Sequence, residues 1–188
     1  MKSVTHTATA LALVLDLAGC ASSGSSSLLA ADAPRALPDS GPVQVTWGDP
    51  SRFSELTSTG NRYAAAQGDW LPKLATYLRT QAEKQLAPGH RLELTIVDIK
   101  RAGQYEPWHG IERQDVRIIR DIYPPRMTVK FRELDANGQV VAEGERKLTD
   151  PGFLASGGML NDTDPLRYEK RMIDSWIRRE FRDPVADR

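Results

Sequence analysis

Met127-Thr128-Val129-Lys130-Phe131-Arg132 is the stretch that decides the fold, and the segments that follow it complete a supersecondary unit. Its apolar and polar side chains alternate strictly, which is the period of a strand with one buried face. Asp135-Ala136-Asn137-Gly138 has the composition of a turn, because Asn and Gly tolerate positive φ. Val140 to Leu148 then returns as the antiparallel partner. These segments predict a β-hairpin over residues 127–148.

Further strands are expected upstream of the hairpin. Residues 43–47 alternate in the same way, and so do residues 92–96. Residues 97–99 continue in the opposite phase, which predicts either a strand covered on both faces or a β-bulge. A short strand is expected at 116–119. The prolines of Tyr123-Pro124-Pro125 lack ladder donors and must lie at an edge, a bend or a strand end.

Two helices are expected from apolar residues at three- and four-residue steps. Asp69 is the predicted cap of the first helix, and Pro88-Gly89 its predicted end. The second is expected to open at Asp164-Pro165, with a capping carboxylate and a proline at its first position. The predicted buried stripes are Trp70, Leu74, Tyr77, Leu78 and Ala82 in the first helix, and Met172, Ile173, Trp176, Ile177 and Phe181 in the second.

The order of these elements is β-α-β-β-β-α. It predicts an α+β fold with a small antiparallel or mixed sheet and two helices packed on one face. Residues 51–67, 102–115 and 149–163 show no period and are expected to form loops.

The N-terminus has the three parts of a secretory signal over Met1 to Gly19. Its apolar run, residues 8–17, is far shorter than the ~20 residues that span a bilayer. Leu17-Ala18-Gly19-Cys20 resembles the cleavage and lipidation box of bacterial lipoproteins. The resemblance implies removal of residues 1–19, a diacylglyceryl thioether on Cys20 and an N-acyl chain such as palmitate. Ala21 instead of Asp implies the outer membrane, with the protein facing the periplasm. The alternative is a signal peptide cut nearby that leaves Cys20 as a free thiol.

Composition divides the remaining chain into a tether, one domain and a tail. Residues 20–42 are rich in small residues and proline, which predicts a flexible tether. Residues 43–182 have the size of a single domain, and residues 183–188 form a C-terminal tail. Basic and acidic residues balance at 25 each, so net charge gives no case for nucleic acid. Once Cys20 is lipidated no thiol is left, which excludes cysteine catalysis, thiolate metal sites and disulfides.

Three motifs resemble one family. Residues 121–126, Asp-Ile-Tyr-Pro-Pro-Arg, run into a strand, Leu148 to Phe153 follows, and Arg167-Tyr168-Glu169-Lys170-Arg171 precedes Trp176. Together they resemble the exported domain-of-unknown-function family 3016 over most of residues 43–181. The activity of that family is not established, so the resemblance implies no catalytic residue and no cofactor.

Candidate chemistry gathers in one segment, where Trp108-His109 is followed by Glu112 and Asp115. These three polar side chains could chelate Zn²⁺ or act as base and orienter. The spacing matches no zinc signature, and the alternative is a solvated loop with Trp108 packed against the core.

Other candidate sites have simpler alternatives. Ser156 before Gly157-Gly158 lacks a nucleophile elbow and fits a loop better than a serine hydrolase. Residues 161–164 with Asp150 offer oxygen ligands for Ca²⁺ but lack the twelve-residue loop pattern. The last helix carries basic residues that could bind anionic lipid or an acidic partner, or simply face solvent. They are Arg167, Lys170, Arg171, Arg178, Arg179 and Arg182.

These observations favour a non-enzymatic, lipid-anchored envelope module that binds another envelope component and uses no cofactor. The alternative is a small periplasmic metal-binding protein or hydrolase that uses His109, Glu112 and Asp115. A third hypothesis is a stress or lipid-binding lipoprotein that uses its basic last helix.

Overall fold

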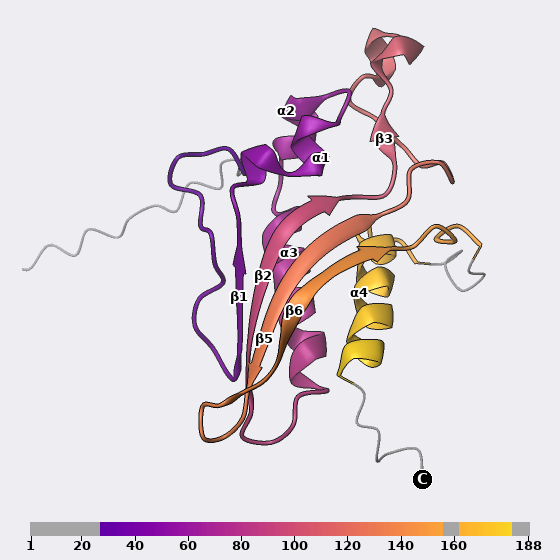
Figure 1. Cartoon of the computed structure of the whole chain (residues 1–188). Helices are drawn as coiled ribbons and strands as arrows, with labels where there is room; N and C mark the ends of the chain where they lie inside the picture. The colour runs from indigo at the N-terminus through magenta and orange to yellow at the C-terminus, as the bar shows by residue number, and fades with distance from the viewer. Residues whose placement is uncertain (1–26, 156–161, 182–188) are drawn as a thin grey trace, which may run out of the picture.

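A computed structural model describes residues 27–155 and 162–181, so the predicted signal peptide, Cys20, Ser156, Asn161 and the tail at 183–188 lie outside the described residues. A mixed four-stranded sheet of order β1-β2-β5-β6 forms its centre (Figure 1). β1 (Val43–Trp47) pairs in parallel with β2 (Arg91–Lys100). β2, β5 (Arg126–Leu134) and β6 (Val140–Thr149) pair antiparallel. The predicted α+β class is confirmed.

The hairpin of β5 and β6 forms as its alternation predicts. One oxygen of Asp135, Oδ1, accepts hydrogen bonds from the N–H groups of Asn137 (2.8 Å) and Gln139 (2.9 Å). Gly138 has a φ of 80°, a region that an L side chain rarely adopts. This turn fixes the register in which Phe131 lies opposite Gly144.

The change of phase in β2 is a β-bulge, the second of the two alternatives. The register with β5 shifts between Ile96 and Asp98, and Val97 is left 38% exposed. The inserted residue returns Ile99 to the buried face. It also places Asp98 and Lys100 on the opposite face, where α1 (Ser54–Thr57) covers only this end of the sheet.

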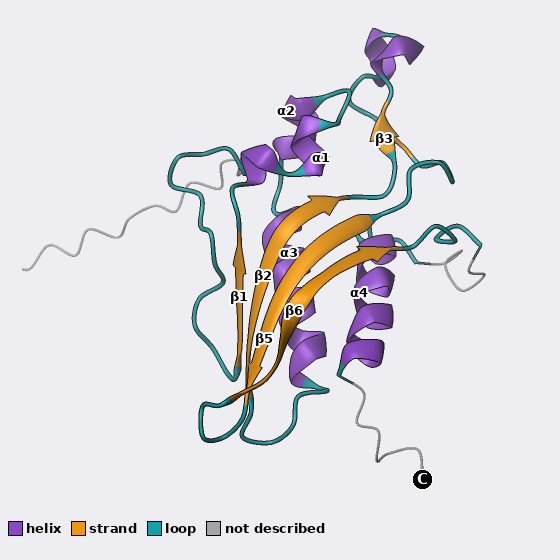
Figure 2. Cartoon of the chain, viewed as in Figure 1, coloured by secondary structure: helices purple, strands orange, loops and turns teal. Residues whose placement is uncertain are grey.

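Two helices, α3 (Trp70–Glu83) and α4 (Arg167–Glu180), lie against the other face of the sheet (Figure 2). Their apolar stripes and the inward side chains of the strands make up the main core. Tyr77 of α3 donates its hydroxyl hydrogen to Asp174 of α4, with oxygen–oxygen distances of 3.0 and 2.9 Å. Burial and this bond raise the pKa of Tyr77 to about 12.

Both helices are shorter than expected. α3 ends at Glu83, before Pro88, and its Asp69 carboxylate pairs with Lys73 rather than with a backbone N–H. α4 begins at Arg167, because Asp164 uses its Oδ1 to accept from the N–H of Leu166 in a preceding turn.

Residues 51–67 were expected to form a loop, and this prediction is wrong. A 3₁₀ helix at Pro50–Arg52 is followed by α1 (Ser54–Thr57) and α2 (Arg62–Ala66). Single turns are too short to show an apolar period. They are held by caps instead, as where Asn61 Oδ1 accepts from the N–H of Ala64 at 3.0 Å.

Residues 27–42, for which the sequence predicts a flexible tether, contact the domain in the structure. Leu28 is buried and donates its N–H to the carbonyl of Ala66 at 3.0 Å. Further along, Leu37 donates to the carbonyl of Val45, which lies on the outer edge of β1. The described chain therefore starts beside α2 and then covers one edge of the sheet.

Residues 104–123 form an arm that projects from the end of the sheet where β2 ends (Figure 1). In the arm, β3 (Gln104–Tyr105) pairs antiparallel with β4 (Arg117–Ile118), which confirms a short strand within 116–119. Two 3₁₀ helices, Pro107–His109 and Ile111–Arg113, lie between them. Across the described ranges 27–155 and 162–181, helices fall short of the length and hydropathy that spanning a membrane requires.

Candidate functional site

The structure does not bring His109, Glu112 and Asp115 together. His109 Nε2 lies 2.9 Å from Oε2 of Glu106, which the sequence did not single out. Asp115 instead accepts from Asn61 Nδ2 at 2.7 Å, and Glu112 is exposed. No three His, Cys, Asp or Glu side chains gather as metal ligands anywhere in the described part of the chain. Trp108 is 67% exposed, so its expected packing against the core is wrong.

The other predicted candidates take part in structural contacts where they are described. Asp150 accepts from Arg171 Nη2 at 2.7 Å, and Asp164 pairs with Lys170. On the last helix, Arg167, Lys170 and Arg171 are half-buried rather than exposed, whereas Arg178 and Arg179 face solvent.

A groove of about 500 Å³ opens instead on the sheet face opposite α3 and α4, where β2 ends, β5 begins and β6 ends. Its floor consists of two cross-strand rows, in which residues of the three strands lie side by side. Ser54 of α1 and Ser58, directly after that helix, form the wall. The rows are Lys100–Arg126–Thr149 and Asp98–Thr128–Lys147.

The groove is cationic, because it contains three basic side chains and one carboxylate. That carboxylate, Asp98, already accepts two hydrogen bonds of 2.6 Å, from the N–H and the hydroxyl of Ser54. Arg126 and Lys147 are exposed and form no ion pair with any residue that the structure describes. Their charges are therefore available to a ligand.

The opposite end of the same sheet face is neutralised. Lys130 lies 3.9 Å from Glu145, and Arg132 lies 3.6 Å from Glu93 and 3.8 Å from Glu143. One face thus carries paired charges at one end and unpaired cations at the other. The groove occupies the end with the unpaired cations.

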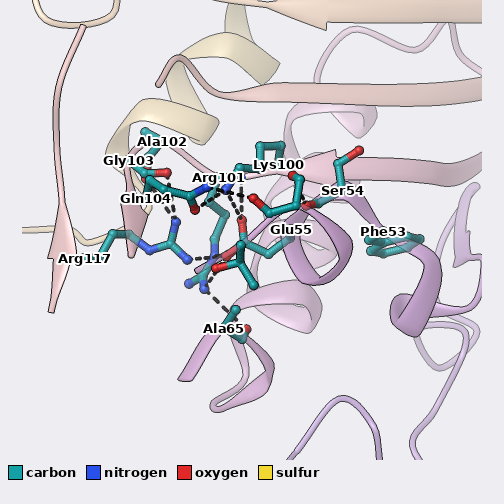
Figure 3. Close-up of polar contacts among 12 residues, drawn as sticks. Phe53, Ser54, Glu55, Ala65, Lys100, Arg101, Ala102, Gly103, Gln104 and Arg117 are labelled. Carbon is teal, nitrogen blue, oxygen red and sulfur yellow. Dashed lines mark hydrogen bonds and ion pairs between the residues drawn. The ribbon is translucent and has the colours of Figure 1, made fainter. Parts of the chain in front are cut away.

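A buried carboxylate next to the groove holds the third cation in place (Figure 3). Glu55 of α1 is fully buried and accepts three hydrogen bonds from Arg101: from its backbone N–H (2.9 Å), Nε (3.1 Å) and Nη2 (2.9 Å). Arg117 of the arm pairs with the same carboxylate, and Lys100 Nζ lies 3.8 Å from Oε2. Glu55 therefore joins α1, the end of β2 and the arm.

Lys100 is itself buried and donates to Oε1 of Gln104 at 3.0 Å. Burial lowers the pKa of Lys100, and the Glu55 carboxylate partly offsets this effect. An anion in the groove would add a second favourable partner for the charged form of this side chain.

Two further buried carboxylates, Glu169 and Glu106, bind residues next to the end of β2 and within the arm. Glu169 of α4 accepts from the N–H of Ala102 at 2.6 Å, and burial raises its pKa. Glu106 in the arm accepts from the Tyr123 hydroxyl at 2.9 Å and lies 2.8 Å from Arg120. Glu106 Oε2 has its ion pairs with His109 and Arg120, whereas Glu169 Oε2 is buried without a hydrogen-bond partner among the described residues.

Sequence reasoning missed the groove residues because their significance depends on register. Lys100, Arg126 and Lys147 each occupy an outward position of a strand, but only the pairing of β2, β5 and β6 makes them neighbours. The bulge before Asp98 is also needed, since without it Lys100 would face the core.

The three motifs that carry the family resemblance lie side by side around the end of β6. Asp150 donates its N–H to the carbonyl of Pro125, and its carboxylate binds Arg171. The ring of Phe153 packs edge-on against Tyr168 with a centroid distance of 4.9 Å. The three segments thus contact one another, and among their residues Arg126, Leu148 and Thr149 line the groove.

The fold defines the protein first as an α+β domain in which a mixed four-stranded sheet carries two helices on one face. Comparison with family models then places it: residues 41–179 match the family described as "Protein of unknown function (DUF3016)", and the chain belongs to that family. The resemblance expected from the motifs is confirmed. No curated protein and no solved structure matches the chain.

Proposed function

We propose that this protein is a non-enzymatic, lipid-anchored module of the bacterial envelope that binds an anionic ligand in the groove. The observation that carries the proposal is the set of unpaired cations, Arg126 and Lys147, beside buried Lys100. The Cys20 box supports the anchor and the expected outer-membrane location facing the periplasm.

The ligand chemistry follows from the donors. A guanidinium binds an oxyanion through two parallel N–H groups, and ammonium groups add point charges. The hydroxyl groups of Thr128 and Thr149 supply further donors on the floor. A phosphate group fits this set, either on a small molecule or in a lipid headgroup.

The test uses the Cys20→Ala chain and its binding of glycerol 3-phosphate, measured by titration calorimetry. Arg126→Gln and Lys147→Gln should each weaken binding about tenfold or more, since a hydrogen bond to a charged group contributes about 1.5–3 kcal/mol. The matched control is Lys130→Gln, an exposed lysine on the same face that is already paired with Glu145. It should leave the affinity unchanged.

Vesicles that contain phosphatidylglycerol distinguish the two sources of phosphate. If the headgroup is the ligand, these vesicles compete with glycerol 3-phosphate, and a free phosphorylated ligand is indicated if they do not. Equal affinities of the wild type, Arg126→Gln and Lys147→Gln would overturn the assignment of the groove.

The anchor is tested separately by labelling cells with a fatty-acid analogue. Label is expected on the wild type and not on Cys20→Ala. Label on both would exclude Cys20 as the acylated residue.

A further inference from the structure

The arm exposes large apolar side chains that the fold does not use. Trp108 is 67% exposed, Ile111 84% and Ile122 65%. Tyr63 of α2, 77% exposed, lines a hollow next to the arm together with Tyr105. Single exposed apolar residues are ordinary, but several on one projecting segment indicate a surface that contacts a membrane or another molecule.

The start of the described chain lies at the same end of the molecule as the arm. Ser27 pairs with Gln67, directly after α2, and Asn61, directly before α2, donates to the carbonyl of Gln114 in the arm at 3.1 Å. Figure 1 shows the chain entering next to α1 and α2, with the arm projecting beyond them.

The distance to the anchor is short. Cys20 precedes Ser27 by seven residues, and seven fully extended residues span at most about 25 Å. A chain held in a bilayer at Cys20 therefore keeps α2 and the arm close to that bilayer. This step rests on the anchor proposed above.

The side chains and charges of the arm suit the bilayer interface. Tryptophan concentrates at the boundary between headgroups and acyl chains, where its ring is half-solvated. The carboxylates of the arm (Glu106, Glu112, Asp115 and Asp121) roughly balance its cations (Arg113, Arg117 and Arg120). Attraction to anionic lipid is therefore not the main force.

We propose that Trp108 and Ile111 insert into the interface of the bilayer to which Cys20 is attached. The arm then acts as a second, non-covalent contact. Insertion holds the domain in one orientation, with the groove at the membrane-proximal end of the sheet.

Fluorescence can test this directly, because the four tryptophans of the chain differ in exposure. Trp47, Trp70 and Trp176 are at most 5% exposed, so Trp108 dominates any change caused by solvent or lipid. The chain without residues 1–19 is coupled through Cys20, its only cysteine, to a maleimide phospholipid in phosphatidylcholine vesicles. This attachment does not depend on natural acylation, so failure of the arm and failure of the anchor remain distinguishable.

On the vesicles, the emission is expected to shift to the blue, and lipids brominated near the headgroup should quench it. Iodide in the water should quench the emission of the coupled chain at least about threefold less than it quenches the emission of the uncoupled chain. Trp108→Phe should abolish all three changes, and Ile111→Ser should reduce them. The matched control is Val141→Ser, which alters an exposed apolar residue on β6 and should change nothing.

High salt should not reverse these effects, since insertion is apolar. Trp108 emission that remains fully accessible to iodide on the vesicles would overturn the proposal and leave the Cys20 anchor untouched. Loss of the blue shift in high salt would show a headgroup contact through charge, and would equally overturn insertion.

Discussion

Glu55→Gln should be one of the most destabilising single-atom changes in this domain. The carboxylate is fully buried, accepts three hydrogen bonds from Arg101 and also pairs with Arg117. The amide keeps the shape but removes the charge, and it points an N–H₂ donor at guanidinium groups. Removing one partner of a buried ion pair costs about 3–5 kcal/mol.

The structure favours the lower end of that range for Glu55→Gln. The side chains of Arg101 and Arg117 remain 14% and 17% exposed, so water partly solvates them after the pair is broken. A loss of about 3 kcal/mol follows. For a domain of this size each kcal/mol lowers Tm by about 2–4 °C, which gives a decrease of roughly 6–12 °C.

Urea unfolding of the Cys20→Ala chain at pH 7 measures this loss. Glu143→Gln is the matched control, because its carboxylate is 67% exposed and lies 3.8 Å from Arg132. Exposed pairs of that kind contribute at most about 1 kcal/mol. If Glu55→Gln and Glu143→Gln unfold at the same urea concentration, the buried network does not hold α1 on the sheet, and the reasoning is refuted.

Three further predictions concern Glu169, Tyr77 and Gly60. Burial raises the folded-state pKa of Glu169 above its ordinary 4.5, so the protonated side chain stabilises the fold at low pH and this contribution is lost as pH rises beyond 4.5. The free energy of unfolding of Glu169→Gln, measured with urea, should therefore increase relative to that of the wild type from pH 4 to pH 8. A difference that stays constant with pH would contradict this. Tyr77, with a pKa of about 12, stabilises the fold below pH 10 and loses this contribution as pH rises toward 12. The difference in Tm between the wild type and Tyr77→Phe should therefore decrease over that interval. Gly60→Ala would place a Cβ against the carbonyl oxygen of Tyr105 and 2.6 Å from Pro107 Cδ. The free energy of unfolding should fall by about 1–3 kcal/mol, and proteolysis of the arm should increase. An unchanged rate of cleavage in the arm would count against this contact.

The period of the apolar residues was sufficient to predict the strands of the sheet and both long helices, but not the order of the strands. Alternation over 127–132 predicted β5, and the change of phase at Val97 predicted either a strand covered on both faces or a bulge, of which the bulge is present. The stripes of α3 and α4 are buried as their spacing requires, with Tyr77 and Phe181 only partly covered. These elements extend over several periods, so the spacing of their apolar side chains indicates which face packs against the core.

The candidate site could not be predicted in the same way. Glu55 lies in a segment without period, and nothing in its neighbours indicates that Arg101 and Arg117 will surround it. The groove depends on the register of three strands, which local sequence does not contain. Nothing in the sequence favours Glu106 over Glu112 as the partner of His109, since both are three residues away. Only the folded arm shows that His109 lies next to Glu106.

The parallel pairing of β1 with β2 has a consequence for the order in which the sheet assembles. β5 and β6 are joined by a short turn and close at little entropic cost, whereas Val43 must find Leu92 across 49 residues of chain. We therefore expect β1, the first strand along the chain, to be the last to gain its neighbour. Until β1 has paired, the folding chain exposes the unpaired backbone groups along one edge of β2, which is an edge that another chain could pair with.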